Sequence, residues 1–220
     1  MNIAFYISGK ATRLCEIIED ERFCLIKEDL KFVFSDDMKE GENIRNLCVN
    51  NEIEWVYFNY KNLEKSDSAS RKNEMLSDEL LCNLNKYKID YLFVFGHHLL
   101  CGKLLEVYKD RIVGFHASLL PHYTGLCGID QAVRGGSFII GTSAFLIDAG
   151  VDTGNVLVEA AMHVSNFEGD NYNAILHPLV DVCYYIIKVL KEDRLQIYKD
   201  KMIIKGADYG KVHFFPEIEK

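Results

Sequence analysis

Residues 113–157 read VGFHASLLPHYTGLCGIDQAVRGGSFIIGTSAFLIDAGVDTGNVL. An apolar strand opens this stretch, and His116 follows the strand directly. Pro121 and several irregularly spaced glycines come next, and the tripeptide Asp152-Thr153-Gly154 stands near the end. A histidine just beyond a strand and a carboxylate on a later turn can move a proton or stabilise a charge. These two residues are therefore candidates for catalysis, provided that their loops converge.

The segments before this stretch alternate between strand and helix patterns. Apolar runs of strand length are Asn2–Ser8, Leu30–Ser35, Glu54–Tyr60, Tyr91–Gly96 and Arg111–Phe115. Helical spacing or composition separates them, at Leu14–Ile18, Glu42–Asn51, Asn73–Lys88 and Gly102–Lys109, and Lys61–Arg71 is a polar loop. Such alternation predicts an α/β fold with a mostly parallel sheet, helices on both faces and ligands at the carboxyl ends of the strands.

The segments after residue 113 predict an antiparallel extension of this sheet. The chain is expected to be irregular as far as Gly136, after which Gly141–Ile147 and Asn155–Val164 are strands. Asn171–Leu190 is the strongest amphipathic helix, and Gln196–Phe215 is typical of short strands. No internal repeat or linker divides the chain, so we expect a single domain over 1–220. Within it, 1–95 is a Rossmann-like half, 96–165 carries the chemistry, and 166–220 is a helix with a tail.

Composition excludes several classes of protein. The chain has 220 residues, a formal net charge of −8 and a pI near 5.4, which argues against nucleic-acid binding. Hydrophobic residues make up 49% of the sequence, which excludes intrinsic disorder. We expect no signal peptide, because the N-terminus has no basic region, and no membrane span. The seven cysteines show no metal-like spacing, which favours reduced thiols and a cytoplasmic location, and we expect Cys101 and Cys127 to be buried.

The sequence from His116 to Pro121, followed by Gly125, Gly141-Thr142 and Asp152-Thr153-Gly154, resembles the formyltransferase fold family. Ile7-Ser8-Gly9 at the start of a helix is similar to the purine-type members, and the resemblance covers residues 1–165. It implies a Rossmann-like formyltransferase fold and an enzyme of one-carbon metabolism. The implied formyl donor is 10-formyltetrahydrofolate, a co-substrate, and no metal is implied.

The resemblance also implies the roles of particular residues. His116 is the implied catalytic histidine and Asp152 the implied catalytic aspartate. The pterin ring of the folate would lie against the loops Phe95–Leu100 and Ile147–Val151. The folate-binding residues expected there are His98, Leu99, Leu100, Ile147, Asp148, Gly150 and Val151, although Leu99 and Leu100 can equally be core residues. His97 and His98 do not predict a metal site, because adjacent side chains project apart.

The acceptor of the formyl group follows less directly from the sequence. Residues 8–13 resemble a loop that holds a phosphate, and the substrate-binding residues expected are Ser8, Gly9, Lys10, Arg13, Ser118 and Pro121. Yet Ala11 stands where the purine enzymes have a glycine, and Arg13 stands where they have an asparagine. Residues 126–129 occupy the place of a His-rich segment. These departures favour a nucleotide-linked amino sugar over glycinamide ribonucleotide, the purine alternative. A deformylase or a non-catalytic nucleotide- or folate-binding module stays open. The C-terminal helix and the aromatic pairs Tyr184-Tyr185 and Phe214-Phe215 are expected to pack internally, with a homodimer as the alternative.

One further departure concerns catalysis. Family members generally carry an asparagine two residues before the catalytic histidine, and this chain has Gly114. Loss of one donor to an oxyanion typically costs ~10²–10³ in rate. Three outcomes are open: His97, His98 or Asn155 supplies the donor, the activity is weak, or the chain binds without turnover.

Overall fold

The computed structural model describes residues 1–38, 41–63, 68–167, 171–198 and 201–215. These residues form two compact units. Unit 1 consists of Met1–Gly114 with Ile147–Gly150, and unit 2 consists of Phe115–Leu146 with Val151–Lys220. Strand β5 (Ile112–His116) therefore begins in unit 1 and ends in unit 2.

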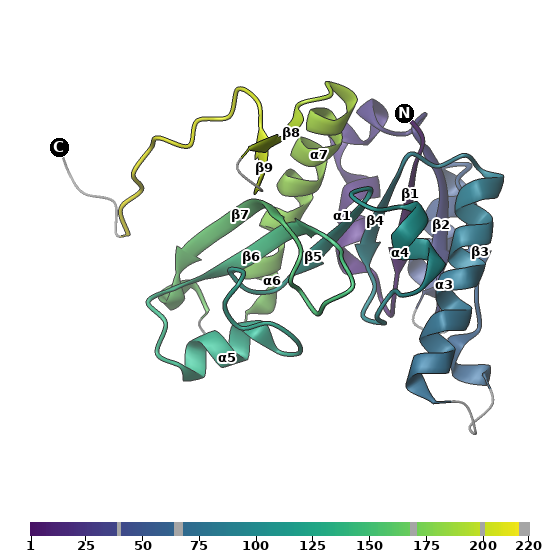
Figure 1. The fold of residues 1–220 in the computed structure, drawn as a ribbon, viewed down its shortest axis with the longest axis horizontal. Helices are drawn as coiled ribbons and strands as arrows, with labels where there is room; N and C mark the ends of the chain where they lie inside the picture. The colour runs from purple at the N-terminus through teal and green to yellow at the C-terminus, as the bar shows by residue number, and fades with distance from the viewer. Residues whose placement is uncertain (39–40, 64–67, 168–170, 199–200, 216–220) are drawn as a thin grey trace. The chain divides into compact units, whose positions relative to one another are not determined.

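Unit 1 is built on parallel strands (Figure 1). Strand β1 (Ile3–Ile7) lies between β2 (Leu30–Ser35) and β4 (Tyr91–Phe95) and is parallel to both. Strand β3 (Glu54–Tyr57) pairs with β2, and the first residues of β5 pair with β4. Ile7 is in register with Ser35 and Phe95, so the carboxyl ends of β1, β2 and β4 meet at one edge. The loops that follow these strands are thereby brought together.

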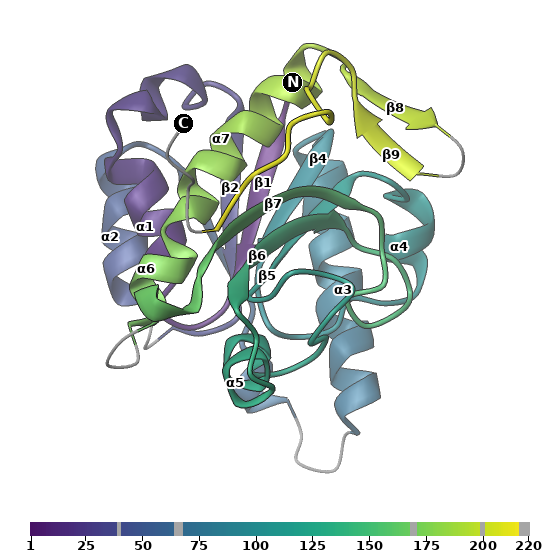
Figure 2. The ribbon, with the colours of Figure 1, turned by 90° about the vertical axis from the view of Figure 1, so that its left-hand side faces the viewer.

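Helices cover both faces of this parallel sheet, α1 and α2 on one side and α3 and α4 on the other (Figure 2). Because strand side chains alternate between faces, Ala4 and Tyr6 of β1 pack toward α3 and α4 in one apolar cluster with Leu80 and Leu104. Unit 1 holds α1 (Thr12–Glu19), α2 (Glu42–Asn50), α3 (Ala69–Lys86), α4 (Lys103–Val107) and the 3₁₀ helices η1 (Glu21–Leu25) and η2 (Tyr60–Asn62).

Unit 2 is built on the antiparallel pair β6 (Ile139–Leu146) and β7 (Val156–His163). Its helices α5 and α6 contribute Ile129 and Ile175 to a cluster that includes Ile140 of β6. Helix α7 contacts both strands of the pair. The remaining elements are α5 (Gly128–Arg134), η3 (Val164–Asn166), α6 (Tyr172–Leu176), α7 (Pro178–Lys191) and the hairpin β8 (Leu195–Tyr198) with β9 (Lys201–Ile204).

The segment Tyr172–Lys191 is the one helical stretch, within the described ranges, that is long and apolar enough by composition to cross a membrane. Of its most apolar window, 56% is buried inside the structure. Ile186, Ile187 and Val189 are almost fully buried. This burial is what a core helix of a folded domain shows, and length and composition alone are weak grounds for a span.

The α/β fold with parallel strands, an antiparallel pair and flanking helices is confirmed. One element prediction is wrong. Helix α5 lies in the stretch expected to be irregular, because glycines at both ends hide its short apolar pattern. The predicted C-terminal helix is confirmed over 172–191, with a break at His177 because Pro178 has no N–H to continue the hydrogen bonding of α6.

The predicted C-terminal strands are confirmed for residues 195–198 and 201–204, whereas 205–215 form no strand. Residues 64–67 of the predicted loop and 199–200 of the predicted tail lie outside the described residues. The single domain over 1–220 stays a prediction.

Candidate active site

His116 and Asp152 lie together in unit 2. His116 ends β5, and its Nδ1 is 3.4 Å from Oδ2 of Asp152. Its Nε2 is 3.0 Å from the carbonyl oxygen of Tyr123. The two side chains are 12% and 18% exposed, so the pair is shielded from water without being sealed off. Both ring nitrogens face oxygen acceptors, and only the imidazolium form has a hydrogen to donate to each.

Asp152 is held by the same loop that contacts His116. The backbone N–H of Gly125 donates to Oδ2 of Asp152 over 2.8 Å. The segment 123–125 therefore contacts the histidine through a carbonyl and the aspartate through an amide. Tyr123 was not among the predicted site residues, because a backbone carbonyl leaves no signal in the identity of a side chain.

The loop after His116 is fixed by two buried serines. Ser118 donates from Oγ to the carbonyl of His122 over 2.7 Å. Ser143 of β6 accepts from the N–H of Leu120 at 2.9 Å, and its Oγ lies 2.7 Å from the carbonyl of Ser118. Ser118 thus supports the loop, and it also lines a cavity of about 250 Å³ with Leu119 and Tyr123. The predicted contact of Pro121 with a substrate stays a prediction; Pro121 is exposed and its peptide bond to Leu120 is cis.

The Asp152-Thr153-Gly154 turn has the backbone geometry of a tight loop. Asp152 adopts φ 54°, a left-handed conformation. A Cβ placed on Gly154 would lie 1.6 Å from the carbonyl oxygen of Leu146, so only glycine fits without a shift of the backbone. This close approach aligns the turn against the end of β6 and so places the carboxylate of Asp152.

The two loops predicted to bind folate both contribute to unit 1 through residues 96–100 and 147–150. Leu99 is 53% exposed, whereas Leu100 is 7% exposed and belongs to the core cluster that Ile147 packs against. Leu100 is thus a core residue, which was the open alternative. In the second loop Asp148 accepts from the N–H of Gly150, and Val151, which is exposed, belongs to unit 2.

The loop predicted to hold a phosphate has a left-handed residue at position 11, where a glycine was expected and Ala11 stands. Gly9 has φ 64° and Ala11 φ 50°, so both are left-handed, and α1 begins at Thr12 without a side-chain cap. Backbone N–H groups at such a helix start attract anions. Lys10 is exposed beside them.

Arg13 does not extend toward solvent as a free cation. Its side chain is 9% exposed and its Nη1 is 2.7 Å from Oε2 of Glu16. A groove of about 750 Å³ runs beside this loop. Its lining is carboxylate- and amide-rich, with Lys10 as its cation: Lys10, Thr12, Cys15, Glu16, Glu19, Glu42, Asn43 and Asn46.

The cysteines correct one expectation. Cys15, Cys48 and Cys183 are buried, and burial raises the pKa of each thiol, that of Cys48 to about 12. Of the two cysteines expected to be buried, Cys101 is half-buried and Cys127 is exposed at the N-cap position of α5, where its backbone is left-handed. None of the seven cysteines forms a disulfide. Within the described residues no group of three or more His, Cys, Asp or Glu side chains is placed to hold a metal ion.

Comparison with known sequences identifies the family. The model of the family described as formyl transferase matches residues 1–177, and the chain belongs to this family. The phosphoribosylglycinamide formyltransferase of Bacillus subtilis is 29% identical over 86 residues, which cover 39% of this chain and 44% of that protein. The methionyl-tRNA formyltransferase of Thermodesulfovibrio yellowstonii is 27% identical over 149 residues, covering 67% and 46%. The chain spans less than half the length of these curated relatives.

Solved structures agree with this family. Glycinamide ribonucleotide transformylase 1 from Symbiobacterium toebii superimposes with a TM-score of 0.76 at 25% identity, covering 93% of each chain. A formyltetrahydrofolate deformylase from Pseudomonas syringae shares the fold, with a TM-score of 0.73 at 16% identity over 92% of this chain and 65% of that one.

Proposed function

We propose that this protein transfers a formyl group from 10-formyltetrahydrofolate to a primary amine. The single observation that carries the proposal is the His116–Asp152 pair, 3.4 Å apart and held by the 123–125 loop, in a chain that belongs to the formyl transferase family. Transfer forms a C–N bond to the acceptor, breaks the C–N bond to the folate, and moves one proton from the acceptor amine to the folate nitrogen.

The chain's own residues have distinct parts in this reaction. As an imidazolium, His116 donates a hydrogen bond to the oxygen that gains negative charge at the formyl carbon. Asp152 stabilises the charged imidazole by its carboxylate. In the resting geometry the Tyr123 carbonyl accepts from Nε2, so the imidazole exchanges this acceptor for the reacting oxygen when substrate binds.

One property of the residues proposed for folate binding suits a flat aromatic ring: an apolar side chain exposed on a loop. Leu99 is an apolar side chain left 53% exposed on the loop after β4, and Val151 is 47% exposed. An exposed apolar side chain such as Leu99 supplies a wall for a flat heterocycle, whose polar edge is satisfied by backbone groups. His98, Asp148 and Gly150 belong to the same proposal, and Leu100 supports it from the core.

For the acceptor we propose a nucleotide-linked amino sugar. A phosphate would bind the N–H groups at the start of α1, which no N-cap side chain covers, beside Lys10. The groove next to this loop offers carboxylate and amide side chains, such as Glu42 and Asn43, which suit the hydroxyl groups of a sugar. Arg13 already forms an ion pair with Glu16, so we assign it a structural role and no contact with the acceptor.

Glycinamide ribonucleotide is the second candidate. It is favoured by the superposition on a glycinamide ribonucleotide transformylase over 93% of both chains. It is also favoured by Ala11, whose left-handed backbone reproduces the conformation that a glycine would adopt.

A formylation assay with mass detection separates the two acceptors. The protein is mixed with 10-formyltetrahydrofolate and either a panel of amino-sugar nucleotides or glycinamide ribonucleotide. We expect a 28-Da gain, about the mass of one formyl group replacing hydrogen, on an amino-sugar nucleotide, and none with His116→Asn. Formylation of glycinamide ribonucleotide alone would establish the second candidate, and no product with any acceptor would refute the transfer.

We also propose that the protein works in the cytoplasm on small molecules, without nucleic acid or a membrane. The seven unpaired cysteines and the net charge of −8 support this setting. A homodimer stays a prediction, and since Tyr184 of α7 is buried, the exposed Phe214 and Phe215 are better candidates for its contact than that helix.

A further inference from the structure

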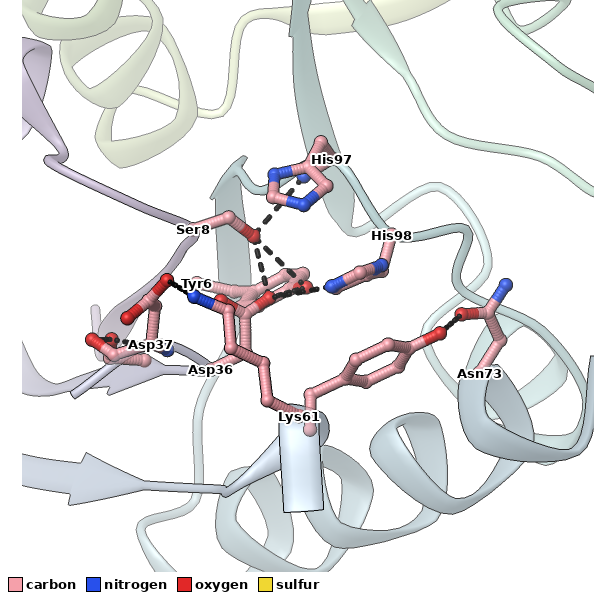
Figure 3. Close-up of polar contacts among 10 residues, drawn as sticks. Tyr6, Ser8, Asp36, Asp37, Lys61, Asn73, His97 and His98 are labelled. Carbon is pink, nitrogen blue, oxygen red and sulfur yellow. Dashed lines mark hydrogen bonds and ion pairs between the residues drawn. The ribbon is translucent and has the colours of Figure 1, made fainter. Parts of the chain in front are cut away.

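A buried carboxylate lies at the carboxyl ends of β1, β2 and β4. Asp36 follows β2 and is 3% exposed, and around it lie Tyr6, Ser8, His97 and His98 (Figure 3). We call these five residues the Asp36 cluster. Ser8 and His98 lie in motifs of the sequence, but Asp36 does not, because a single aspartate after a strand is an ordinary feature.

One oxygen of Asp36 collects three polar groups. Its Oδ2 accepts from the hydroxyl of Tyr6 over 2.7 Å and from Oγ of Ser8 over 2.6 Å. Nε2 of His98 lies 3.5 Å from the same oxygen. An ionised carboxylate is costly to bury unless donors surround it, so these contacts stabilise one another.

The cluster also reaches the backbone of the loop after β4. The N–H of His97 donates to Oγ of Ser8 over 3.3 Å, and that hydroxyl in turn donates to Asp36. A Cβ on Gly96 would lie 2.4 Å from the ring of Tyr6, so the loop passes directly over this ring. Asp36 is thus joined to the loop indirectly, through the Ser8 hydroxyl that accepts from the His97 N–H, and directly through its contact with the His98 side chain.

The orientation of His98 is fixed from a second side. Its ring stacks on Tyr60, with centroids 3.6 Å apart and an angle of 18° between the planes. The hydroxyl of Tyr60 donates to Oδ1 of Asn73 on α3. Burial lowers the pKa of His98 and His97 acts in the same direction, whereas the carboxylate of Asp36 raises it.

We propose that Asp36 is a positioning residue that holds the loop 96–100 in the conformation that binds folate, acting through Ser8 and His98. The inference rests on the proposed function, because it is this loop that carries Leu99 and His98 toward the folate. Asp36 touches no substrate in this proposal. Its neighbour Asp37 contacts Lys61 instead and is a matched control.

The test is calorimetric titration of the full chain with 5-formyltetrahydrofolate. Asp36→Asn keeps the size of the side chain but loses its charge, and we expect about tenfold weaker binding, since small displacements of positioning groups have effects of this order or larger. Asp37→Asn should bind as the wild type does. Unchanged affinity in Asp36→Asn would overturn the inference while the proposed function stands, whereas a wild-type protein that binds no folate would refute the proposed function itself.

Two further measurements keep the test decisive. If Asp36→Asn fails to fold, Ser8→Ala removes the acceptor of the His97 N–H, and we expect the same loss of affinity; unchanged binding overturns the inference. An NMR titration of the His98 ring reports the contact directly, because removing the carboxylate should lower its pKa further. An identical titration in Asp36→Asn and wild type would show that the contact does not form.

Discussion

His116 and Asp152 show how far two side chains depend on groups around them. The imidazole is placed by its position at the end of β5 and by the Tyr123 carbonyl, and the carboxylate by the Gly125 N–H. Gly125 belongs to the sequence pattern of the family, whereas Tyr123 is not singled out by any motif. The geometry of the proposed catalytic pair therefore depends on the loop as well as on the two titratable residues.

At this scale we predict that the pair acts as a unit. His116→Asn and Asp152→Asn should each lower kcat by ~10² or more, because each change removes the charge-assisted contact on which the other depends. The double variant should lose far less than the product of the two single losses. Formylation rates at saturating substrates measure this, with folate binding as the control for folding; full activity of His116→Asn would remove the mechanism.

The second prediction concerns Gly154, which packs against the backbone at the end of β6. An alanine there would place its Cβ against the carbonyl of Leu146, so the turn must shift. We expect Gly154→Ala to destabilise the protein by about 1–3 kcal/mol, as overpacking does. Urea unfolding measures the loss. Gly210→Ala is the control, since its Cβ would meet a neighbouring atom no closer than 3.4 Å, and an equal loss there would contradict the explanation.

At the scale of elements, the start of helix α1 contains a strained residue whose replacement should stabilise the protein. Ala11 precedes the helix with φ 50°, a conformation that costs a residue with a Cβ about 1–2 kcal/mol. Ala11→Gly should remove most of this cost and stabilise the protein despite the greater freedom of glycine in the unfolded chain.

The matched control lies in another helix. Ala174 sits inside α6 with ordinary helical geometry, so Ala174→Gly should destabilise by up to about 1 kcal/mol. Thermal unfolding of the two variants should therefore shift in opposite directions. A lower melting temperature for both would show that the loop before α1 gains nothing from glycine.

Across the whole molecule, buried thiols and phenols make stability depend on alkaline pH. Burial raises the pKa of Cys48 from 9.0 to about 12, and it also raises the pKa values of Cys183, Tyr6 and Tyr108. Above the ordinary pKa, 9.0 for the cysteines and 10.0 for the tyrosines, the unfolded chain releases these protons while the folded chain retains them. The unfolded state then binds fewer protons, and stability falls as pH rises.

We therefore expect the free energy of unfolding to decrease between pH 9 and 12, by about 1.4 kcal/mol per pH unit for each such group. Urea titrations at a series of pH values measure the slope. Cys48→Ala should make the slope shallower, whatever it does to the absolute stability. A slope that is the same in this variant would mean that Cys48 titrates alike in both states.

The order of strands and helices could be read from the sequence because local pattern encodes it. The apolar run Tyr91–Gly96 has the composition of a buried parallel strand, and the structure has β4 there. The helix at Gly128–Arg134 could not be read, because seven residues between glycines give too little periodicity. The proximity of His116 and Asp152 followed only from the family resemblance, since 36 positions along the chain separate them.

What the sequence determined by itself is therefore the α/β class, most element boundaries, and the choice of His116 and Asp152 as candidate catalytic residues. Tertiary structure decided which groups surround the candidate residues: the Tyr123 carbonyl at His116, Ser143 of β6 on the loop that follows it, and Tyr6, Ser8 and His98 around Asp36. The physical reason is range. Strand and helix patterns arise from neighbours within a few residues, whereas a buried carboxylate or a backbone carbonyl acquires its partners only when distant segments pack together.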